Sequence, residues 1–280
     1  MREASMALAS SSLRRRAITA FSLGPLVIAA VLLLPQAAFG VFFLLVLLVA
    51  AWEWCALSGI SQQGQRAGYL ALVGGCVGVL WALPTLQMPL LLVGAAWWVL
   101  QAARILLTRR IDLVAGAQPL QLGVGLLVLL PSWVALMSLR SVPGSGPGLV
   151  LFLLILIWTA DTSAYFVGRR WGRAKLAPVV SPGKTRAGVY GAMVGAAVCG
   201  LGLAWALGLD APHTLLALIV CGLAALISVV GDLYESLLKR RRSMKDSSQL
   251  LPGHGGLLDR IDSLTAAAPV FALGVAWALT

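Results

Sequence analysis

The stretch Gly148-Leu-Val-Leu-Phe-Leu-Leu-Ile-Leu-Ile-Trp-Thr-Ala-Asp161-Thr-Ser-Ala-Tyr165-Phe-Val-Gly168 determines the class of fold. It is about 20 residues long, which is enough for an α-helix to cross the hydrocarbon core of a bilayer. No charged residue precedes Asp161 in it, and an acid so close to lipid is costly and usually functional. The stretch therefore predicts a membrane-spanning helix that carries an ionisable group near one end.

Similar apolar runs recur along the whole chain. Hydrophobic residues make up 60% of the 280 residues and charged residues only 11%, which excludes an ordinary soluble domain. No run alternates like a barrel strand, so the spans are expected to be helices, which satisfy their own backbone groups in lipid. We predict an all-α, polytopic integral membrane protein with about nine transmembrane helices in a single membrane domain over 1–280. The expected spans are 17–34, 39–57, 67–83, 89–106, 120–139, 148–168, 188–208, 213–230 and 264–280.

The net charge of +11 is distributed in a way that predicts the topology. If the N-terminus lies in the cytoplasm, the cytoplasmic segments contain all of the 21 lysines and arginines except Arg140. This positive-inside bias predicts an N-in/C-out orientation in the cell's inner membrane. The basic excess then indicates attraction to anionic lipid and not to nucleic acid. Arg14-Arg15-Arg16 and the run after it also resemble a secretory signal, but the run is long for one and its removal would invert this orientation.

Ionisable groups are concentrated in the second half of the chain. Among the first five spans and their loops, the acidic exceptions are Glu53, near the cytoplasmic end of the second span, and Asp112 in a loop. Most other ionisable groups lie in 169–187 and 231–263, two segments predicted to be cytoplasmic. We therefore expect 1–147 to serve mainly as a scaffold and 148–280 to contain the catalytic helices and loops.

The first polar group with a chemical pattern runs from Asp232 to Lys239. On a helix, Asp232, Glu235, Ser236 and Lys239 share one face, because they are spaced i, i+3, i+4 and i+7. Two acids there suit a hard divalent cation such as Mg²⁺, which binds one or two carboxylates and substrate phosphate oxygens. Lys239 and Arg240 supply positive charge for phosphate. The alternative is a solvated amphipathic helix end with ordinary pairing of Glu235 and Lys239.

The second group follows in Leu251-Pro-Gly-His-Gly-Gly-Leu-Leu-Asp-Arg-Ile-Asp262. Its glycines and proline predict a turn whose backbone approaches a ligand closely, with His254 at the centre. Asp259 and Asp262 then lie three apart at the start of the last helix, where acids also complement the helix dipole. A purely structural turn is the alternative, but Lys245-Asp246 before it and Arg260 between the two acids favour a site.

The third group joins the end of one span to a short loop. Asp161, Tyr165 and Gly168 fall on one helix face, and Ser181-Pro-Gly-Lys184-Thr185 predicts a tight turn with donors for an anion. The loop is not a P-loop, because Pro178 stands where that motif needs glycine. A basic cytoplasmic loop with a Pro-Gly turn is the alternative.

The 27 residues from Ser236 to Asp262, S-x-L-K-R-x₄-K-D-x-S-x₂-L-P-x-H-G-G-L-x-D-R-I-D, support a family assignment. At every specified position they resemble the signature of the phosphatidate cytidylyltransferases, also called CDP-diacylglycerol synthases. Asp161 to Arg169 and Ser181 to Thr185 resemble a second region of that family, so the resemblance covers roughly 155–262. Ala187 departs from it, since family members usually have Glu or Gln there.

The resemblance implies an enzyme that joins phosphatidate and CTP into CDP-diacylglycerol and pyrophosphate. It implies Mg²⁺ as cofactor, as one or two ions with a monovalent cation as a further option. It implies a lipid bilayer, CTP and phosphatidate as partners, allows a homodimer, and includes no nucleic acid. Asp232 and Asp259 are the principal expected metal ligands, and the secondary ones are Glu235, Asp246 and Asp262. Other expected catalytic or substrate-binding residues are Lys239, Arg240, Lys245, His254, Arg260, Ser181, Lys184, Thr185, Ser236, Asp161 and Tyr165.

Two other functions remain open from the residues. A CTP-dependent lipid kinase has a related layout but transfers the γ-phosphoryl group and releases CDP. An ion-coupled transporter also has acids among its helices, but they are expected near mid-span, whereas these cluster at span ends.

Overall fold

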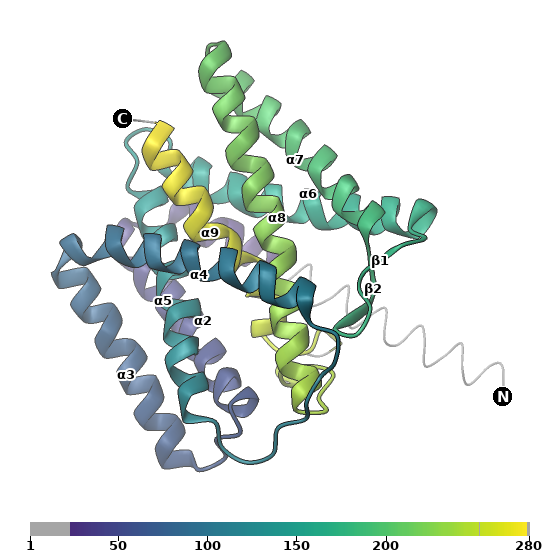
Figure 1. Ribbon diagram of the computed structural model, residues 1–280. Coiled ribbons are helices and arrows are strands. Elements are labelled where there is room, and N and C mark those ends of the chain that lie inside the picture. The colour runs from purple at the N-terminus through teal and green to yellow at the C-terminus, as the bar shows by residue number, and fades with distance from the viewer. Residues whose placement is uncertain (1–22, 252, 279–280) are drawn as a thin grey trace, which may run out of the picture.

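The computed structural model describes residues 23–251 and 253–278. They form a bundle of helices with one small hairpin (Figure 1). A first helix covers Leu23–Leu33. The elements that follow are α2 Gln36–Leu57, α3 Gln63–Ala82, the short 3-10 helix η1 Pro84–Leu86, α4 Gln87–Leu107, α5 Pro119–Arg140, α6 Gly146–Trp171, β1 Lys175–Ala177, β2 Ser181–Thr185, α7 Arg186–Leu207, α8 Ala211–Arg241 and α9 Leu258–Ala278.

The predicted polytopic helical membrane fold is confirmed in its class. Seven helices in the described part of the chain are long and apolar enough to cross a membrane: α2, η1 with α4, and α5 to α9. The predicted span 67–83 corresponds to α3, which is 20 residues long but is outside this set and begins with the polar Gln63, Gln65 and Arg66. The predicted first span begins outside the described residues. The count of nine and the N-in/C-out orientation therefore stay predictions.

A close crossing of α8 and α9 lies near the centre of the bundle (Figure 1). A Cβ atom on Gly231 would lie 2.5 Å from the Asp262 carbonyl oxygen and 2.8 Å from Ala266 Cβ. Small residues at such a crossing let two helix backbones approach closely in a membrane. Because Gly231 precedes Asp232, this crossing brings the acid-bearing ends of the two helices together.

The segment between α6 and α7 differs from the predicted all-α fold. Lys175–Ala177 and Ser181–Thr185 form a two-stranded antiparallel sheet in which Lys175 pairs with Thr185 and Ala177 with Ser181. The turn lies at 178–180, so the predicted tight turn over Ser181–Thr185 is wrong. Pairing satisfies backbone groups of a segment whose Ala177 and Val180 are buried. The hairpin directs Lys184 toward α8, which a turn at that position would not do.

Arg242, just after α8, connects the two halves of the chain. Its Nε donates to the Leu57 carbonyl at 2.9 Å, and its Nη1 donates to the carbonyls of Val114 at 3.0 Å and Gly116 at 2.6 Å. Gly59 has φ +74°, and a Cβ there would lie 2.6 Å from Arg242 Nη2. The end of α8 is thus held by the ends of α2 and of the loop before α5.

Arg140, the arginine that departs from the positive-inside pattern, has a structural explanation. It is only 9% exposed, and its guanidinium donates to the carbonyls of Val31 and Leu34 and lies over the Phe39 ring. Val31 lies in the last turn of the first helix and Leu34 directly follows it, where carbonyls lack intrahelical partners. Arg140 therefore caps that helix.

We expect Arg140→Gln to destabilise the protein by about 2 kcal/mol, because two buried carbonyls lose a charged donor. Thermal unfolding in detergent should show a lower Tm. Arg110→Gln is the matched control, since Arg110 is 86% exposed and pairs only with the exposed Asp112. An unchanged Tm in Arg140→Gln would contradict the capping role.

Candidate active site

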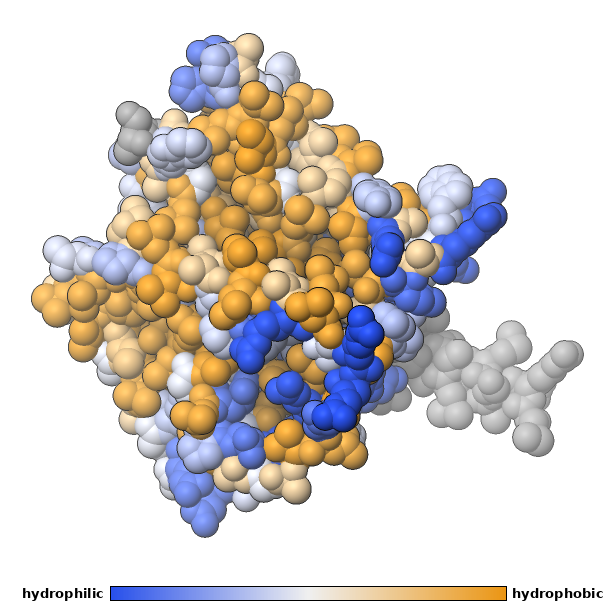
Figure 2. Space-filling view, viewed as in Figure 1, coloured by the Kyte–Doolittle hydropathy of each residue, from blue (hydrophilic) through white to orange (hydrophobic). Residues whose placement is uncertain are grey.

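Polar side chains from β2, α8 and α9 converge at one end of the central helix pair. On the face shown in Figure 2, hydrophilic surface gathers around the lower part of α8 and the hairpin, within a largely hydrophobic exterior. Lys184 extends from β2 so that its Nζ lies 2.7 Å from Asp232 Oδ2 and 3.4 Å from the Val229 carbonyl oxygen. Ser236, one turn along α8, donates to Asp232 Oδ1 at 3.3 Å. The hairpin and α8 thus form one edge of the site.

Lys239 lies between two buried acids. Its Nζ is 3.3 Å from Glu235 Oε1 and donates to Asp259 Oδ1. The three side chains are 13%, 3% and 6% exposed, so little water screens their charges. The ion pair of Glu235 and Lys239 is the one expected for a simple solvated helix end. Lys239 also binds Asp259, however, so the ion pairing reaches a second helix.

Asp259 is held rigidly by the loop before α9. Its Oδ2 accepts hydrogen bonds from the Ser247 amide at 2.9 Å, the Ser247 hydroxyl at 2.9 Å and the Gly256 amide at 2.8 Å. Its Oδ1 accepts a hydrogen bond from Lys239 and, as a carboxylate oxygen, keeps further acceptor capacity. The loop therefore fixes Oδ2 of Asp259, whereas Oδ1 faces Lys239.

Asp161 and Asp262 complete a cluster with excess negative charge. Asp161 interacts electrostatically with Lys184 and Asp232, and so does Asp262. Asp262 Oδ1 also accepts a hydrogen bond from the Ser263 amide at 2.7 Å. In the described part of the chain, the acids of this cluster outnumber the lysines that contact them; the acids are Asp161, Asp232, Glu235, Asp259 and Asp262.

The glycine-rich loop has the predicted tight turn. Leu251 and Gly255 are paired by a backbone bridge, and Gly253 and Gly255 have φ values of +78° and +83°, which favour glycine. Arg260 donates from Nε and Nη2 to the His254 carbonyl at 3.1 and 2.7 Å, so its guanidinium supports the loop. The buried Nδ1 of His254 has no hydrogen-bond partner among the described residues.

Other predicted site residues are not brought into the cluster. Tyr165 is 57% exposed and its hydroxyl accepts a hydrogen bond from Arg169 at 2.9 Å on the same helix. Arg240, Lys245 and Asp246 are exposed on the segment that follows Lys239. Ser181 is half-buried at the start of β2. In this structure these side chains surround the cluster without joining it.

Thr185 has a structural role that differs from the predicted substrate contact. It is 6% exposed, and its Oγ1 accepts a hydrogen bond from the Gly188 amide at 3.1 Å as the N-cap of α7. Cβ atoms on Gly168 and Gly172 would approach Thr185 Oγ1 to 2.9 and 2.6 Å, so the end of α6 packs directly on the cap. A threonine immediately before an apolar helix is a capping signal that the sequence contained.

Thr185→Val should therefore lower stability by about 1 kcal/mol and leave the KM for the expected substrate, CTP, unchanged, because valine keeps the shape but removes the capping oxygen. Thr185→Ser keeps that oxygen and should resemble the unaltered protein in both measurements. A raised KM in Thr185→Val with no change in Tm would instead support the predicted substrate contact.

Sequence reasoning missed Ser247, described above, and also Glu53 of α2. Its carboxylate accepts hydrogen bonds from the amides of Leu257 and Leu258 at 3.0 and 2.6 Å and from the Ser248 hydroxyl at 2.5 Å. The available signal was its position, a single acid in an otherwise apolar predicted span. Its partners lie about 200 residues away in the chain, and no local pattern indicates them.

The donor set suits a hard divalent cation that also binds substrate. The buried carboxylate of Glu235 is ion-paired with Lys239 at Oε1 and keeps further acceptor capacity, and carboxylate oxygens are the ligands that Mg²⁺ prefers. Among the described residues, no group of three or more His, Cys, Asp or Glu side chains is placed to hold a metal ion by itself. Mg²⁺ fits such an open set, because it completes its octahedron with water and phosphate oxygens.

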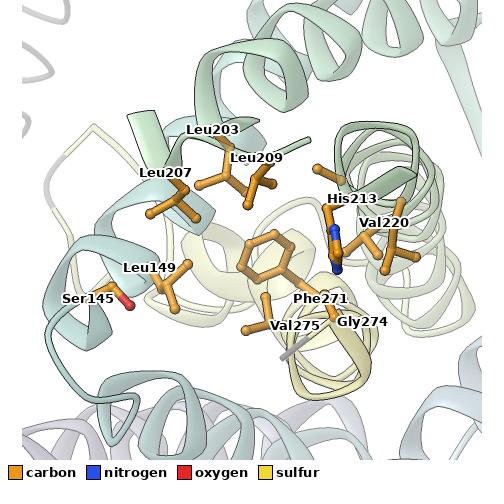
Figure 3. A pocket seen from close by; sticks show the side chains of 13 residues that line it. Ser145, Leu149, Leu203, Leu207, Leu209, His213, Val220, Phe271, Gly274 and Val275 are labelled. Atoms are coloured by element: carbon orange, nitrogen blue, oxygen red, sulfur yellow. The ribbon is translucent and has the colours of Figure 1, made fainter. Parts of the chain in front are cut away.

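The apolar cavity in Figure 3 lies elsewhere, among the start of α6, the end of α7, the start of α8 and the end of α9. It has a volume of about 70 Å³ and is lined mainly by aliphatic side chains and Phe271, with Ser145 and His213 as its polar side chains. His213 is near the beginning of the 31-residue α8, whereas Asp232 is near its end. This cavity is therefore separate from the acidic cluster.

Acids and lysines grouped at the ends of membrane helices, beside a basic hairpin, define a membrane enzyme for phosphate-bearing substrates. The chain belongs to the cytidylyltransferase family, whose family model matches residues 14–277. It is 44% identical over 266 residues to the phosphatidate cytidylyltransferase of Pseudomonas aeruginosa, covering 95% of this chain and 97% of that protein. It is 35% identical over 284 residues to the phosphatidate cytidylyltransferase of Haemophilus influenzae, covering 92% and 97% respectively.

Proposed function

We propose that this protein is a phosphatidate cytidylyltransferase, which transfers CMP from CTP to phosphatidate and releases pyrophosphate in phospholipid biosynthesis. The observation that carries the proposal is the 44% identity to a phosphatidate cytidylyltransferase over 95% of the chain. The cluster of Lys184, Asp232, Lys239 and Asp259 adds a chemical reason, because it combines phosphate-binding cations with acids that suit a metal ion.

The reaction needs no nucleophile from the protein. A phosphate oxygen of phosphatidate attacks the α-phosphorus of CTP, the bond from that phosphorus to the bridging oxygen breaks, and pyrophosphate leaves with the electron pair. Both reactants are polyanions, so their mutual repulsion contributes to the barrier. Such transfers depend on positioning and on electrostatic stabilisation of the transition state.

The two lysines are suited to that task. Each carries three donors on a flexible stem, so Lys184 and Lys239 can keep one carboxylate contact and donate to a phosphate oxygen as well. Arg240 and Lys245 are exposed beside them and add charge at the entrance for CTP. The Nδ1 of His254, which is buried and has no hydrogen-bond partner among the described residues, is a further candidate for contact with substrate.

Asp232 and Asp259 are our principal candidates for Mg²⁺ ligands, and Glu235, Asp246 and Asp262 are secondary ones. When bound, Mg²⁺ would neutralise phosphate charge and align the reacting oxygens. The remaining carboxylates leave room for a second divalent or a monovalent cation. The excess of acids supports this assignment, because a negative site would repel both substrates without added cations.

We place this site at the cytoplasmic face of the inner membrane, with N-in/C-out topology. The basic segments 169–187 and 231–263 support this orientation through the positive-inside bias. CTP then reaches the cluster from the cytoplasm, and the phosphatidate headgroup enters from the side while its acyl chains stay in the bilayer.

The proposal is tested with purified protein in detergent, phosphatidate, Mg²⁺ and CTP labelled at either the α- or the γ-phosphorus. We expect α-label in the lipid fraction and γ-label in pyrophosphate. Transfer of γ-label to lipid with release of CDP would identify a lipid kinase instead. No transfer with any lipid or divalent metal would overturn the proposal and direct attention to transport.

A further inference from the structure

Glu53 is an acid from the N-terminal half whose only hydrogen-bond partners in the described chain belong to the loop before α9. It is 2% exposed and accepts hydrogen bonds from two backbone amides and the Ser248 hydroxyl, while the Ser247 hydroxyl, whose one proton it shares with Asp259, lies 3.2 Å from Oε2. The amides are those of Leu257 and Leu258, at the very start of α9. Glu53 therefore caps α9 from another helix.

The environment of Glu53 explains how a buried carboxylate is tolerated. In the part of the chain that the structure describes, no lysine, arginine or histidine pairs with it. A buried charge without a counterion is strongly unfavourable unless other groups stabilise it. The N-terminus of α9 does so, because its free amides and its dipole favour an anion.

Glu53 and Asp259 together bind three successive amides. Asp259 accepts from the Gly256 amide, and Glu53 accepts from those of Leu257 and Leu258. The Ser247 hydroxyl lies between the two acids, 3.2 Å from Glu53 Oε2 and 2.9 Å from Asp259 Oδ2. The position of Asp259 is therefore linked to that of Glu53 by the loop backbone and by one hydroxyl.

Gly256 shows how closely Glu53 approaches this loop. A Cβ atom there would lie 2.7 Å from Glu53 Oε1 and would overlap the Ser247 hydroxyl. The second glycine of His254-Gly-Gly is thus required by the contact with α2, and its φ, unlike that of Gly255, is not positive. This close approach restricts where the loop can lie relative to Glu53.

We propose that Glu53 is a positioning residue that holds Asp259 in its reactive place, an inference that rests on the proposed function of Asp259. Among the described residues, Glu53 hydrogen-bonds only to residues 247–258, so in this proposal it acts on Asp259 through the loop. In this view residues 236–262 need the contact with α2 to hold Asp259 in place.

Glu53→Gln tests the proposal because glutamine keeps the volume but replaces one acceptor oxygen by an NH₂ group. That group would face the donors that now bind the carboxylate. We expect kcat to fall about 10- to 100-fold, as for other residues that orient a metal ligand, with little change in the KM for CTP. Glu53→Asp retains the charge but is one methylene shorter, so its kcat should be intermediate. Asp112→Asn, which removes an exposed acid, is the matched control.

A second measurement needs neither metal nor substrate. In hydrogen–deuterium exchange of the metal-free protein, peptides that cover 247–258 should exchange faster in Glu53→Gln, while peptides of α5 and α6 should not change. Ser247→Ala, which removes the hydroxyl between the two acids but no carboxylate, should lower kcat by a smaller factor and provides the test if Glu53→Gln does not fold.

Each outcome decides between local positioning and general stability. Normal kcat and normal exchange in Glu53→Gln would overturn the proposal, and so would faster exchange throughout the protein with an unchanged kcat per folded molecule. If Asp259→Asn is inactive and Glu53→Gln is fully active, only the role of Glu53 fails. If the unaltered protein makes no CDP-diacylglycerol, the proposed function fails, but the exchange result still reports on the loop.

Discussion

Asp259→Asn is expected to reduce the synthesis of CDP-diacylglycerol by roughly 1,000-fold, the scale on which electrostatic stabilisation acts in enzyme sites. Asparagine removes the negative charge that faces Lys239 and the proposed Mg²⁺. It also leaves one acceptor oxygen for the Ser247 and Gly256 donors that now bind Oδ2. Turnover is measured with α-labelled CTP at saturating Mg²⁺ and phosphatidate.

The folding of this variant has to be checked separately from its activity. Asp259→Asn should still insert into the membrane and elute from size exclusion like the unaltered protein, because the loop keeps its contacts with Glu53. Activity within a few-fold of normal in a folded sample would contradict the assignment of Asp259 as a metal ligand.

Lys239→Met is expected to have the second largest effect, on stability as well as on turnover. Methionine has a similar volume but leaves Glu235 and Asp259 buried without their shared cation. Removing one partner of a buried ion pair costs about 3 kcal/mol or more. Thermal unfolding in detergent should show a clear decrease in Tm, and CMP transfer should be nearly lost.

A double variant separates the two effects. Lys239→Met with Glu235→Gln removes one of the uncompensated charges, so part of the lost Tm should return. Turnover should not return, because the cation that contacts phosphate is still absent. Recovery of both properties would show that Lys239 only balances charge within the protein.

The polar face of α8 and the turn before α9 were predictable from sequence. Helical spacing placed Asp232, Glu235, Ser236 and Lys239 on one face, and the structure brings these side chains into contact along α8. The glycine-rich turn was also predictable, because Gly253 and Gly255 adopt backbone angles that glycine favours. Helical spacing and turn preferences depend on residues that are close together in the chain, so they can be recognised in a single sequence.

Long-range contacts were not predictable in the same way. Glu53 meets the loop at residue 257 through the tertiary packing of α2, and the chain between them contains no pattern that specifies the pairing. The hairpin was missed because its strands of three and five residues are too short for a reliable alternation signal. The predicted division into a scaffold half and a catalytic half did not anticipate the contact of Glu53 with this loop, for the same reason.

The contact at Gly231 has a consequence for how the protein responds to its bilayer. Membranes of different thickness change helix tilt. Besides the contact at Gly231, α8 and α9 meet closely near their other ends, where a Cβ atom on Gly274 would lie 2.5 Å from side-chain carbons of Val220. We therefore expect the two helices to tilt together as one unit, so that the separation of Asp232 and Asp262 changes little with bilayer thickness.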